Sequence, residues 1–532
     1  MKKISMKSSW RVFLLTGIFL LLAIQGLTRF AVHPPVGFVL DDWSLWSDAL
    51  NGESLWTVSR NALLNPTRPV GACIQQVASR LLLDRMPWYG MLAWGNYSLM
   101  LLLVFLLVRE VTDRTELAFV AGAVFAVLPN LCGQFHWLCM IIGIGQPCYL
   151  VSAWLLARYV RRGTRRSLWG AVFWYALALG NYEVGVFLPA AYAVLLWGRG
   201  WKKCLMALMP FGLALGVYAA WRLTAGFGLG RGVGVAPQFT PGLSGYALKH
   251  TAADIVSWWA GLDWWRAIGD GATGFSELPW IQATLLLLAN GMLVALSGWW
   301  LWKAQSVEMP APSQEKTRDN PFGNATLALF GVAWVAATYL PAFLGYMAPR
   351  LNYLPGAGVA FLVALAAGRM KLERWLGLVL GVVFAGMVVG EGDTKNWGDS
   401  IRFQENLFQT MKEHRADWQD SEVLCLDTRE LSNRLTPGLV APNCHHIDTV
   451  AEYRNAGLLR GFGPSAMAEL ILKGRPGPRV VLDVEYGAHE ENGVLKWHER
   501  YDPSKPFETP MDRVYRLDVL SAGTRSSADV RD

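Results

Sequence analysis

Long apolar runs alternate with short polar segments over the first 390 residues of the chain. Each run approaches the length of roughly 20 helical residues that a bilayer requires, which predicts about eleven membrane-spanning helices. They cover approximately residues 12–27, 89–108, 116–128, 139–157, two helices within 168–197, then 204–221, 280–302, 325–344, 353–367 and 375–390. We therefore expect an all-α polytopic membrane domain over residues 1–390.

The apolar stretch 168–197 is interrupted by Asn181, Tyr182 and Glu183. Basic residues flank it on both sides, at 158–166 and 199–203, and such residues favour the cytoplasmic side of a membrane. Both ends of the stretch are therefore expected on that side, which requires a hairpin with Glu183 near its outer turn. An acid there is a candidate functional residue, and the alternative is a turn residue solvated by lipid headgroups.

Basic residues before the first run give the orientation of the whole chain. Lys2, Lys3, Lys7 and Arg11 precede it, and no small-residue cleavage site follows it, so we expect a retained helix with a cytoplasmic N-terminus. The odd number of spans then puts the C-terminal tail outside.

Three segments between the spans have sequence patterns that predict interfacial helices or a linker. Residues 28–88 form the first outer loop, in which 70–83 predicts a helix along the membrane interface. The tryptophan-rich stretch 255–265 predicts a second interfacial helix. Residues 303–323 are polar and without periodicity, which is typical of a linker, here cytoplasmic.

The tail, residues 391–532, is predicted to be a small soluble α/β domain. Helical periodicity over 400–414 predicts a helix. Short apolar, β-branched runs at 423–426, 479–482 and 514–517 predict three strands.

Composition agrees with a membrane protein. The chain is 53% hydrophobic and 17% charged, against roughly 25% charged residues in soluble domains. Its net charge of +7 resides mostly in short loops, so it is not the signature of nucleic-acid binding. The seven cysteines, and His445, His446 and Asp448 of the tail, lack the spacing of a metal site. Cys425 and Cys444 could form a disulfide outside the cell, which the sequence leaves open.

The predicted topology brings six polar residues from separate parts of the chain to the outer face: Asp41, Asp42, Arg68, His136, Glu183 and Arg350. A pair of acids can remove a proton from an incoming hydroxyl group. An arginine can hold a phosphate through two parallel hydrogen bonds and stabilise it as a leaving group. The set suits group transfer from a lipid phosphate at a membrane surface. The alternative for Asp41 and Asp42 is an N-cap of the segment that starts at Trp43.

Five short motifs follow one another over about residues 30–360. They are Asp41-Asp42-Trp43, Arg68-Pro69 with Pro87, Tyr89 and Asn96 after it, Phe125 to Pro129 with His136-Trp137, Tyr182-Glu183 with Pro189, and Arg350-Leu351-Asn352-Tyr353-Leu354-Pro355. In this order and spacing they resemble the GT-C class of membrane glycosyltransferases, most closely the bacterial relatives of the protein O-mannosyltransferases and of the tetratricopeptide-containing mannosyltransferases. Asn181 or Tyr182 stands where those relatives often carry Lys, Leu351 and Asn352 replace an aromatic-aliphatic pair, and no tetratricopeptide repeat follows the last span.

The resemblance implies a glycosyltransferase of a bacterial inner membrane that uses a polyprenyl-phosphate sugar as donor. Asp41 or Asp42 would be the catalytic base, with Asp42 favoured. Arg350, and more weakly Arg68, would bind the donor phosphate.

The resemblance also implies supporting positions. Glu183 would support the acceptor, the base or a metal, with His136, Tyr182 and Tyr353 as further supporting residues. The acceptor could be a protein, a lipid or a polysaccharide. No cofactor is predicted, and a divalent metal stays an open alternative.

Two other classes of function are alternatives to sugar transfer. A transporter or flippase for a lipid-linked glycan would need polar residues along the spans, which are nearly free of charge in the sequence. A non-catalytic membrane scaffold would not need the acids together with Arg350.

Overall fold

The computed structural model describes residues 2–32, 54–63, 68–82, 86–128, 145–224, 262–306, 322–343, 353–369, 372–427, 462–473, 475, 477–482, 488–499 and 502–518. Six helices in these ranges are long and apolar enough to cross a membrane: Val12–Phe30, Trp88–Thr112, Trp201–Thr224, Trp280–Ala304, Asn324–Pro341 and Leu376–Lys395. The chain is therefore a helical membrane protein, as the apolar runs predict.

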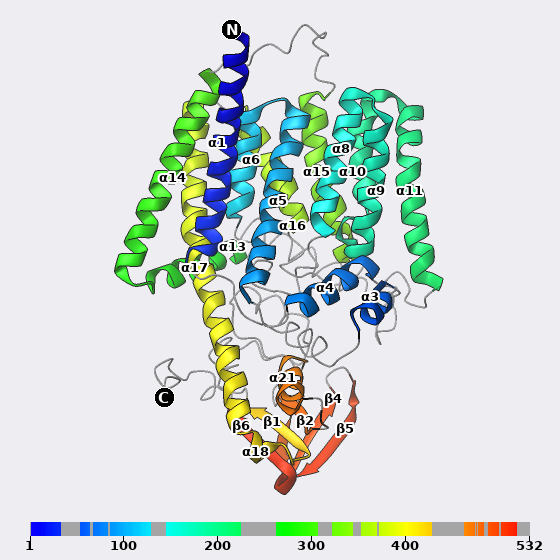
Figure 1. The fold of residues 1–532 in the computed structure, drawn as a ribbon, viewed down its shortest axis with the longest axis vertical. Helices are drawn as coiled ribbons and strands as arrows, with labels where there is room; N and C mark the ends of the chain where they lie inside the picture. The colour runs from blue at the N-terminus through cyan, green and yellow to red at the C-terminus, as the bar shows by residue number, and fades with distance from the viewer. Residues whose placement is uncertain are drawn as a thin grey trace.

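The helices that follow the predicted runs lie side by side as one bundle in the upper part of Figure 1. They are α1 (Lys2–Phe30), α5 (Met86–Thr112), α6 (Thr115–Val127), α8 (Gly145–Arg162), α9 (Arg165–Asn181), α10 (Leu188–Leu196), α11 (Trp201–Thr224), α14 (Trp280–Ser306), α15 (Asn324–Phe343), α16 (Tyr353–Ala367) and α17 (Leu372–Glu413). Some are shorter than a span: α6 has 13 residues, and at roughly 1.5 Å per residue it is shorter than the roughly 30 Å of a hydrocarbon core. The bundle helices are established, and the count of eleven spans stays a prediction.

Aromatic packing joins the N-terminal helix to the middle of the chain. The ring of Trp300 in α14 stacks between Phe13 of α1, at 4.7 Å, and Phe119 of α6, at 4.6 Å. Its indole nitrogen donates a hydrogen bond of 3.0 Å to the backbone oxygen of Phe13. Trp300 is fully buried, so its packing and its hydrogen bond hold α1, α6 and α14 together.

The first loop contributes two helices at the lower end of the bundle, opposite the N-terminus (Figure 1). The predicted interfacial helix is present as α4 (Pro69–Leu82). It follows α3 (Leu55–Leu63), which the sequence analysis did not predict. Val70 of α4 packs against Gly180 at the end of α9, so α4 is fixed to the hairpin over 168–197.

The last bundle helix does not end where the last apolar run ends. α17 continues without interruption through residues 390 and 391 into the predicted tail helix at 400–414. Gly392 lies in direct contact with the backbone of Gly271, where a β-carbon would not fit, so this glycine serves close packing instead of ending the helix. Gly271 belongs to α13 (Leu262–Ser276), which lies along α17. The part of the predicted interfacial helix before Leu262 lies outside the described residues.

The tail contains the three predicted strands as one parallel sheet. Its order is β2 (Arg479–Leu482), β1 (Val423–Asp427) and β6 (Val514–Asp518). α21 (Phe462–Leu472) precedes β2, and α18 (Arg415–Trp418) precedes β1. Cys425 is buried in β1. Cys444 lies outside the described residues, so the disulfide stays a prediction.

A second, antiparallel sheet was not predicted. It is formed by β3 (His489–Glu491), β4 (Val494–Glu499) and β5 (Asp502–Pro510), followed by the short helix η6 (Met511–Arg513). The guanidinium of Arg479 joins the two sheets, because it lies 4.4 Å from the ring centre of Trp497 and 4.5 Å from that of Phe507.

The core of the tail extends to the bundle. Tyr89, near the start of α5, belongs to the same hydrophobic cluster as Leu407 and Met411 of α17 and Trp418 of α18. Its hydroxyl donates a 3.3 Å hydrogen bond to the backbone oxygen of Ser79 in α4. The tail is thereby packed against the same end of the bundle as the first-loop helices (Figure 1).

Candidate functional site

The structure describes four of the eight residues selected from the sequence. Arg68, Tyr182, Glu183 and Tyr353 lie in described segments. The other four lie outside the described residues: Asp41, Asp42, His136 and Arg350.

Arg68 and Glu183, 115 residues apart in the chain, form a two-pronged ion pair. The Nε of Arg68 donates to Oε2 of Glu183 at 3.0 Å, and its Nη2 donates to Oε1 at 3.2 Å. Their side chains are 22% and 25% exposed, so the pair is partly accessible. The predicted hairpin and the predicted first-loop helix thus bring these two residues together.

Local sequence fixes the position of Arg68. Pro69 is the first residue of α4, where its missing N–H and fixed φ suit a helix start. The backbone oxygen of Arg68 accepts the first helical hydrogen bond, from Ala72 at 2.8 Å. The Arg68 guanidinium also lies 4.0 Å from the ring centre of Tyr182, within the range of a cation–π contact.

Glu183 begins the short helix η3 (Glu183–Gly185), which forms the turn between α9 and α10. Tyr182 ends α9 because its backbone is extended, with φ −154° and ψ 127°. The hydroxyl of Tyr149 donates a 2.7 Å hydrogen bond to the backbone oxygen of Tyr182. The ring of Tyr149 also lies under Gly185, where a β-carbon would come within 2.6 Å of it. The turn is therefore held by a rigid buried ring.

Two further tyrosines support the same turn. Tyr175 of α9 donates a 2.6 Å hydrogen bond to the backbone oxygen of Val186. Tyr192 of α10 donates to the hydroxyl of Ser152 at 3.1 Å. The rings of Tyr175 and Tyr149 meet edge to face, with centres 6.0 Å apart. Tyr175 thus holds the backbone of the turn, and Tyr192 ties α10 to α8, which carries Tyr149.

Arg222 is a third member of the site, which sequence reasoning missed. It lies near the end of α11, is 3% exposed, and its Nη1 is 3.6 Å from Oε1 of Glu183. The same nitrogen donates to the hydroxyl of Tyr218 at 3.1 Å. Basic residues favour the cytoplasmic side of a membrane, so an arginine at the outer end of an apolar run is unusual. That exception could have identified Arg222 from the sequence. We call Arg68, Glu183 and Arg222 the Glu183 cluster.

The cluster keeps its acid ionised. Burial acts to raise the pKa of Glu183, but the charge and hydrogen bonds of Arg68, together with the charge of Arg222, lower the pKa below its usual value. A carboxylate with a lowered pKa is a weak proton acceptor. Glu183 is therefore suited to hold arginine side chains, and less suited to act as a base.

Tyr353 occupies a different environment. It is the first residue of α16, is buried, and meets the rings of Tyr97 at 5.0 Å and Phe125 at 5.7 Å edge to face. This packing accounts for its burial in the bundle. Its predicted supporting role stays a prediction.

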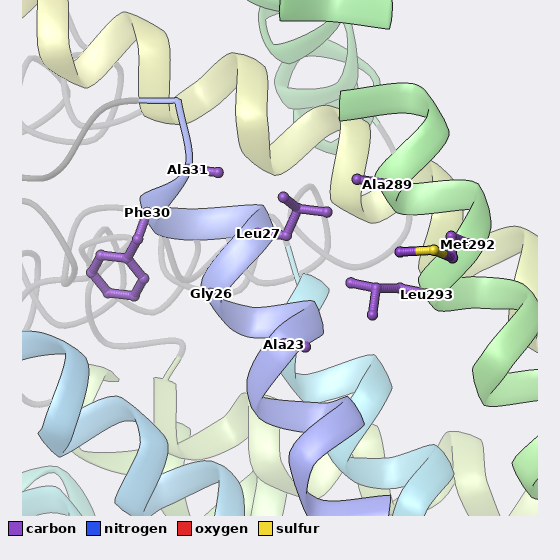
Figure 2. A pocket seen from close by; sticks show the side chains of 8 residues that line it. All are labelled: Ala23, Gly26, Leu27, Phe30, Ala31, Ala289, Met292 and Leu293. Carbon is purple, nitrogen blue, oxygen red and sulfur yellow. The ribbon is translucent and has the colours of Figure 1, made fainter. Parts of the chain in front are cut away.

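An apolar pocket of about 390 Å³ opens between α1 and α14 (Figure 2). Leu27 and Phe30 line it from α1, and Met292 and Leu293 line it from α14. The eight residues around it carry no charged or amide side chain, which suits a hydrocarbon chain. Among the described residues, no group of three or more His, Cys, Asp and Glu side chains could hold a metal ion.

A second polar cluster lies inside the bundle, where α1, α14 and α17 meet. Asn290 donates a 3.1 Å hydrogen bond to Oε2 of Glu391, and both residues are fully buried. Arg29 is fully buried too; it donates to the backbone oxygen of Leu128 at 2.7 Å and lies 3.9 Å from Asp393. We call Arg29, Asn290, Glu391 and Asp393 the Glu391 cluster. The apolar pattern predicts that the last span ends at residue 390, which would place Glu391 and Asp393 in the tail; the continuous α17 places them in the bundle.

Neither the scan against protein-family models nor the search of the curated proteins finds a match to this chain.

Proposed function

We propose that this protein is a membrane glycosyltransferase that moves a sugar from a polyprenyl-phosphate donor to an acceptor hydroxyl at the outer face of a bacterial inner membrane. One observation carries the proposal: the two-pronged pair of Arg68 and Glu183, which joins residues of two separate motifs at one end of the bundle. Placing two partly exposed charges near a lipid phase costs free energy, so such a pair usually serves a function.

The arrangement of the chain supports the same site. α1 ends, α3 begins and α16 begins towards the end of the bundle at which α4 lies (Figure 1). In the sequence, Asp41 and Asp42 fall between α1 and α3, and Arg350 falls three residues before α16. In the proposed orientation the N-terminus is cytoplasmic, eleven helices cross the membrane, and this end with the tail is extracytoplasmic.

The proposed reaction is a single displacement. Asp42, or Asp41, removes the proton from the acceptor hydroxyl, whose oxygen attacks the anomeric carbon of the sugar. The bond from that carbon to the phosphate oxygen breaks in the same step, and the polyprenyl phosphate leaves with the electron pair. Arg350 stabilises the charge that develops on the phosphate. The anomeric configuration is inverted.

Within this mechanism Glu183 acts through Arg68. Since its pKa is lowered, the carboxylate stays charged at neutral pH and holds the guanidinium group in a fixed orientation. The pair uses two of the five N–H donors of Arg68. The apolar pocket between α1 and α14 is of a kind that accepts the hydrocarbon chain of a lipid donor (Figure 2).

The test is transfer of radiolabelled sugar from a panel of polyprenyl-phosphate sugars by the purified chain. We expect Asp42→Asn, or Asp41→Asn, and Arg350→Ala to lower the rate by roughly 10²–10⁴-fold. Matched controls are Asp113→Asn and Arg114→Ala between α5 and α6, because both residues are well exposed and lie outside the proposed site. Equal rates for all five variants and the wild-type chain, or transfer from nucleotide sugars as readily as from the lipid donors, would contradict the proposal.

A second candidate is a transporter or flippase for a lipid-linked glycan. The observation that favours it is the Glu391 cluster, because fully buried ionisable residues inside a membrane bundle often mark a transport path. A flipping assay with labelled lipid-linked glycan in vesicles separates the two functions. Flipping that is lost in Glu391→Gln, without any sugar transfer by the wild-type chain, would favour the transporter.

A further inference from the structure

We infer that Arg222 is a positioning residue, which fixes the carboxylate of Glu183 from α11 so that Arg68 is presented in one orientation. The inference rests on the proposed function, because it assigns a role within that site. Neither the motifs nor the apolar pattern of the sequence selected this residue.

Geometry gives the first step. Arg68 approaches both carboxylate oxygens of Glu183, at 3.0 and 3.2 Å. Arg222 approaches only Oε1, at 3.6 Å, from a different helix. Two cations on one carboxylate restrict its rotation more than one does, because turning the group would lengthen at least one of the contacts. Arg222 therefore contributes orientation, while Arg68 is the group that faces the site.

Burial gives the second step. Arg222 is 3% exposed, and a buried guanidinium without a counter-charge is strongly unfavourable. The carboxylate of Glu183 supplies that counter-charge, and the hydroxyl of Tyr218 accepts a hydrogen bond from Arg222. An aliphatic residue at this position would avoid the free energy of desolvating a guanidinium group. The presence of an arginine here is therefore explained by its interaction with Glu183.

The position of Arg222 in α11 gives the third step. The other buried residues of this helix, Cys204, Ala207 and Phe211, all lie in its first half. Its remaining faces expose large apolar side chains such as Leu213 and Val217. Arg222 is thus the buried residue that ties the far end of α11 to η3. The helix carries the cation to the turn, and the turn holds the helix end.

The surroundings of Glu183 limit what else could control its charge. Among the described residues, the groups that interact with it electrostatically are Arg68 before α4, Tyr149 of α8, and Tyr218 and Arg222 of α11. α15 also packs on η3, and its described length, Asn324–Phe343, carries no charged residue. Removal of Arg222 therefore takes away one of two cations, and the pKa of Glu183 should rise.

The experiment measures the pH dependence of sugar transfer and the KM for the lipid donor. In Arg222→Met we expect the acid limb of the profile of KM against pH, where KM rises, to move up by roughly one pH unit, because protonated Glu183 no longer holds Arg68. Protonation of the base, Asp42 or Asp41, lowers kcat and leaves this limb in place. Arg222→Lys, which keeps the charge, should return the limb towards that of the wild-type chain. The matched control is Arg199→Met. Arg199 lies over the ring of Tyr159, as Arg222 lies over that of Tyr218, but it donates to the backbone oxygens of Tyr159 and Val160 in α8.

Each outcome decides the inference. An unchanged acid limb in Arg222→Met, with transfer intact, overturns the inference and leaves the proposed function standing. If that variant does not fold, Tyr218→Phe decides, because loss of the hydroxyl that orients Arg222 should move the limb in the same direction by less. A limb that stays in place there overturns the inference as well. If the wild-type chain transfers no sugar from any lipid donor, the proposed function fails and the inference fails with it.

Discussion

The Glu183 cluster and the Glu391 cluster are both built from charged side chains on separate helices, but their partners lie at different distances. In the Glu183 cluster, Arg68 donates hydrogen bonds of 3.0 and 3.2 Å to Glu183, and about a quarter of each of these two side chains is exposed. In the Glu391 cluster, Arg29 lies 3.9 Å from Asp393, and Glu391 accepts a hydrogen bond from the amide of Asn290. Close pairing with access to solvent suits a site, whereas more distant pairing of mostly buried side chains suits packing or a transport path.

The largest expected difference is in the coupling energy of the two ion pairs. A double-mutant cycle of Arg68→Met and Glu183→Gln should give about 2 kcal/mol of coupling in the free energy of unfolding, because each single change breaks both hydrogen bonds of a partly buried ion pair. The corresponding cycle of Arg29→Met and Asp393→Asn should give less, because at 3.9 Å the two charged groups are too far apart for a hydrogen bond between them. Equilibrium unfolding in detergent measures both. Equal coupling energies would remove the distinction between the clusters.

The rigid support under the Glu183 cluster is tested next. Gly185→Ala should destabilise the chain by roughly 1–3 kcal/mol, because its β-carbon would come within 2.6 Å of the buried ring of Tyr149. The control is Gly291→Ala in α14, where a β-carbon meets nothing within 4 Å. That change should stabilise the helix by roughly 0.5–1 kcal/mol. Thermal unfolding compares the two, and a harmless Gly185→Ala would mean that the turn can move away from Tyr149.

Acid should weaken the Glu183 cluster by a smaller amount. The pKa of Glu183 is lowered in the folded chain, so its ionised form contributes stability at neutral pH, and this contribution is lost as the pH falls through the folded pKa. We expect roughly 1 kcal/mol, reduced from a buried pair because the side chains are partly solvated. Unfolding temperature against pH for the wild-type chain and Glu183→Gln checks this. The wild-type chain should lose more stability on acidification than the variant, and parallel curves would contradict the assignment.

Much of the bundle could be predicted because its signals are local. The basic residues on both sides of 168–197 required a hairpin, and α9 indeed ends at Asn181 with η3 after it. The predicted run 353–367 matches α16 in full. The meeting of Arg68 and Glu183 also follows from topology, since both positions were expected on the outer face.

The missed features depend on contacts between distant segments. The sequence around Arg222 shows an arginine at the outer end of an apolar run, but not its partner, because Glu183 lies in the turn between two other helices. The continuity of α17 past residue 390 depends on Gly392 packing against Gly271 of α13, which no local pattern contains. In the second sheet, β3 (His489–Glu491) is exposed and polar, so it lacks the apolar alternation that predicts a strand.

Glu391→Gln is expected to have the smallest effect, and it therefore gives the sharpest contrast with Glu183→Gln. Among the described residues, Oε1 of Glu391 and Oδ1 of Asn290 are both buried and make no hydrogen bond. A glutamine can accept the existing bond from Asn290 and donate one in return to Oδ1, so the pair becomes two matched amides. The free energy of unfolding should then change by less than about 0.5 kcal/mol, and sugar transfer should be retained. Unfolding and transfer assays on the two variants side by side make the comparison. If Glu391→Gln instead abolishes transfer or flipping while the chain stays folded, then the charge of Glu391 is functional, and the buried cluster belongs to a path through the bundle.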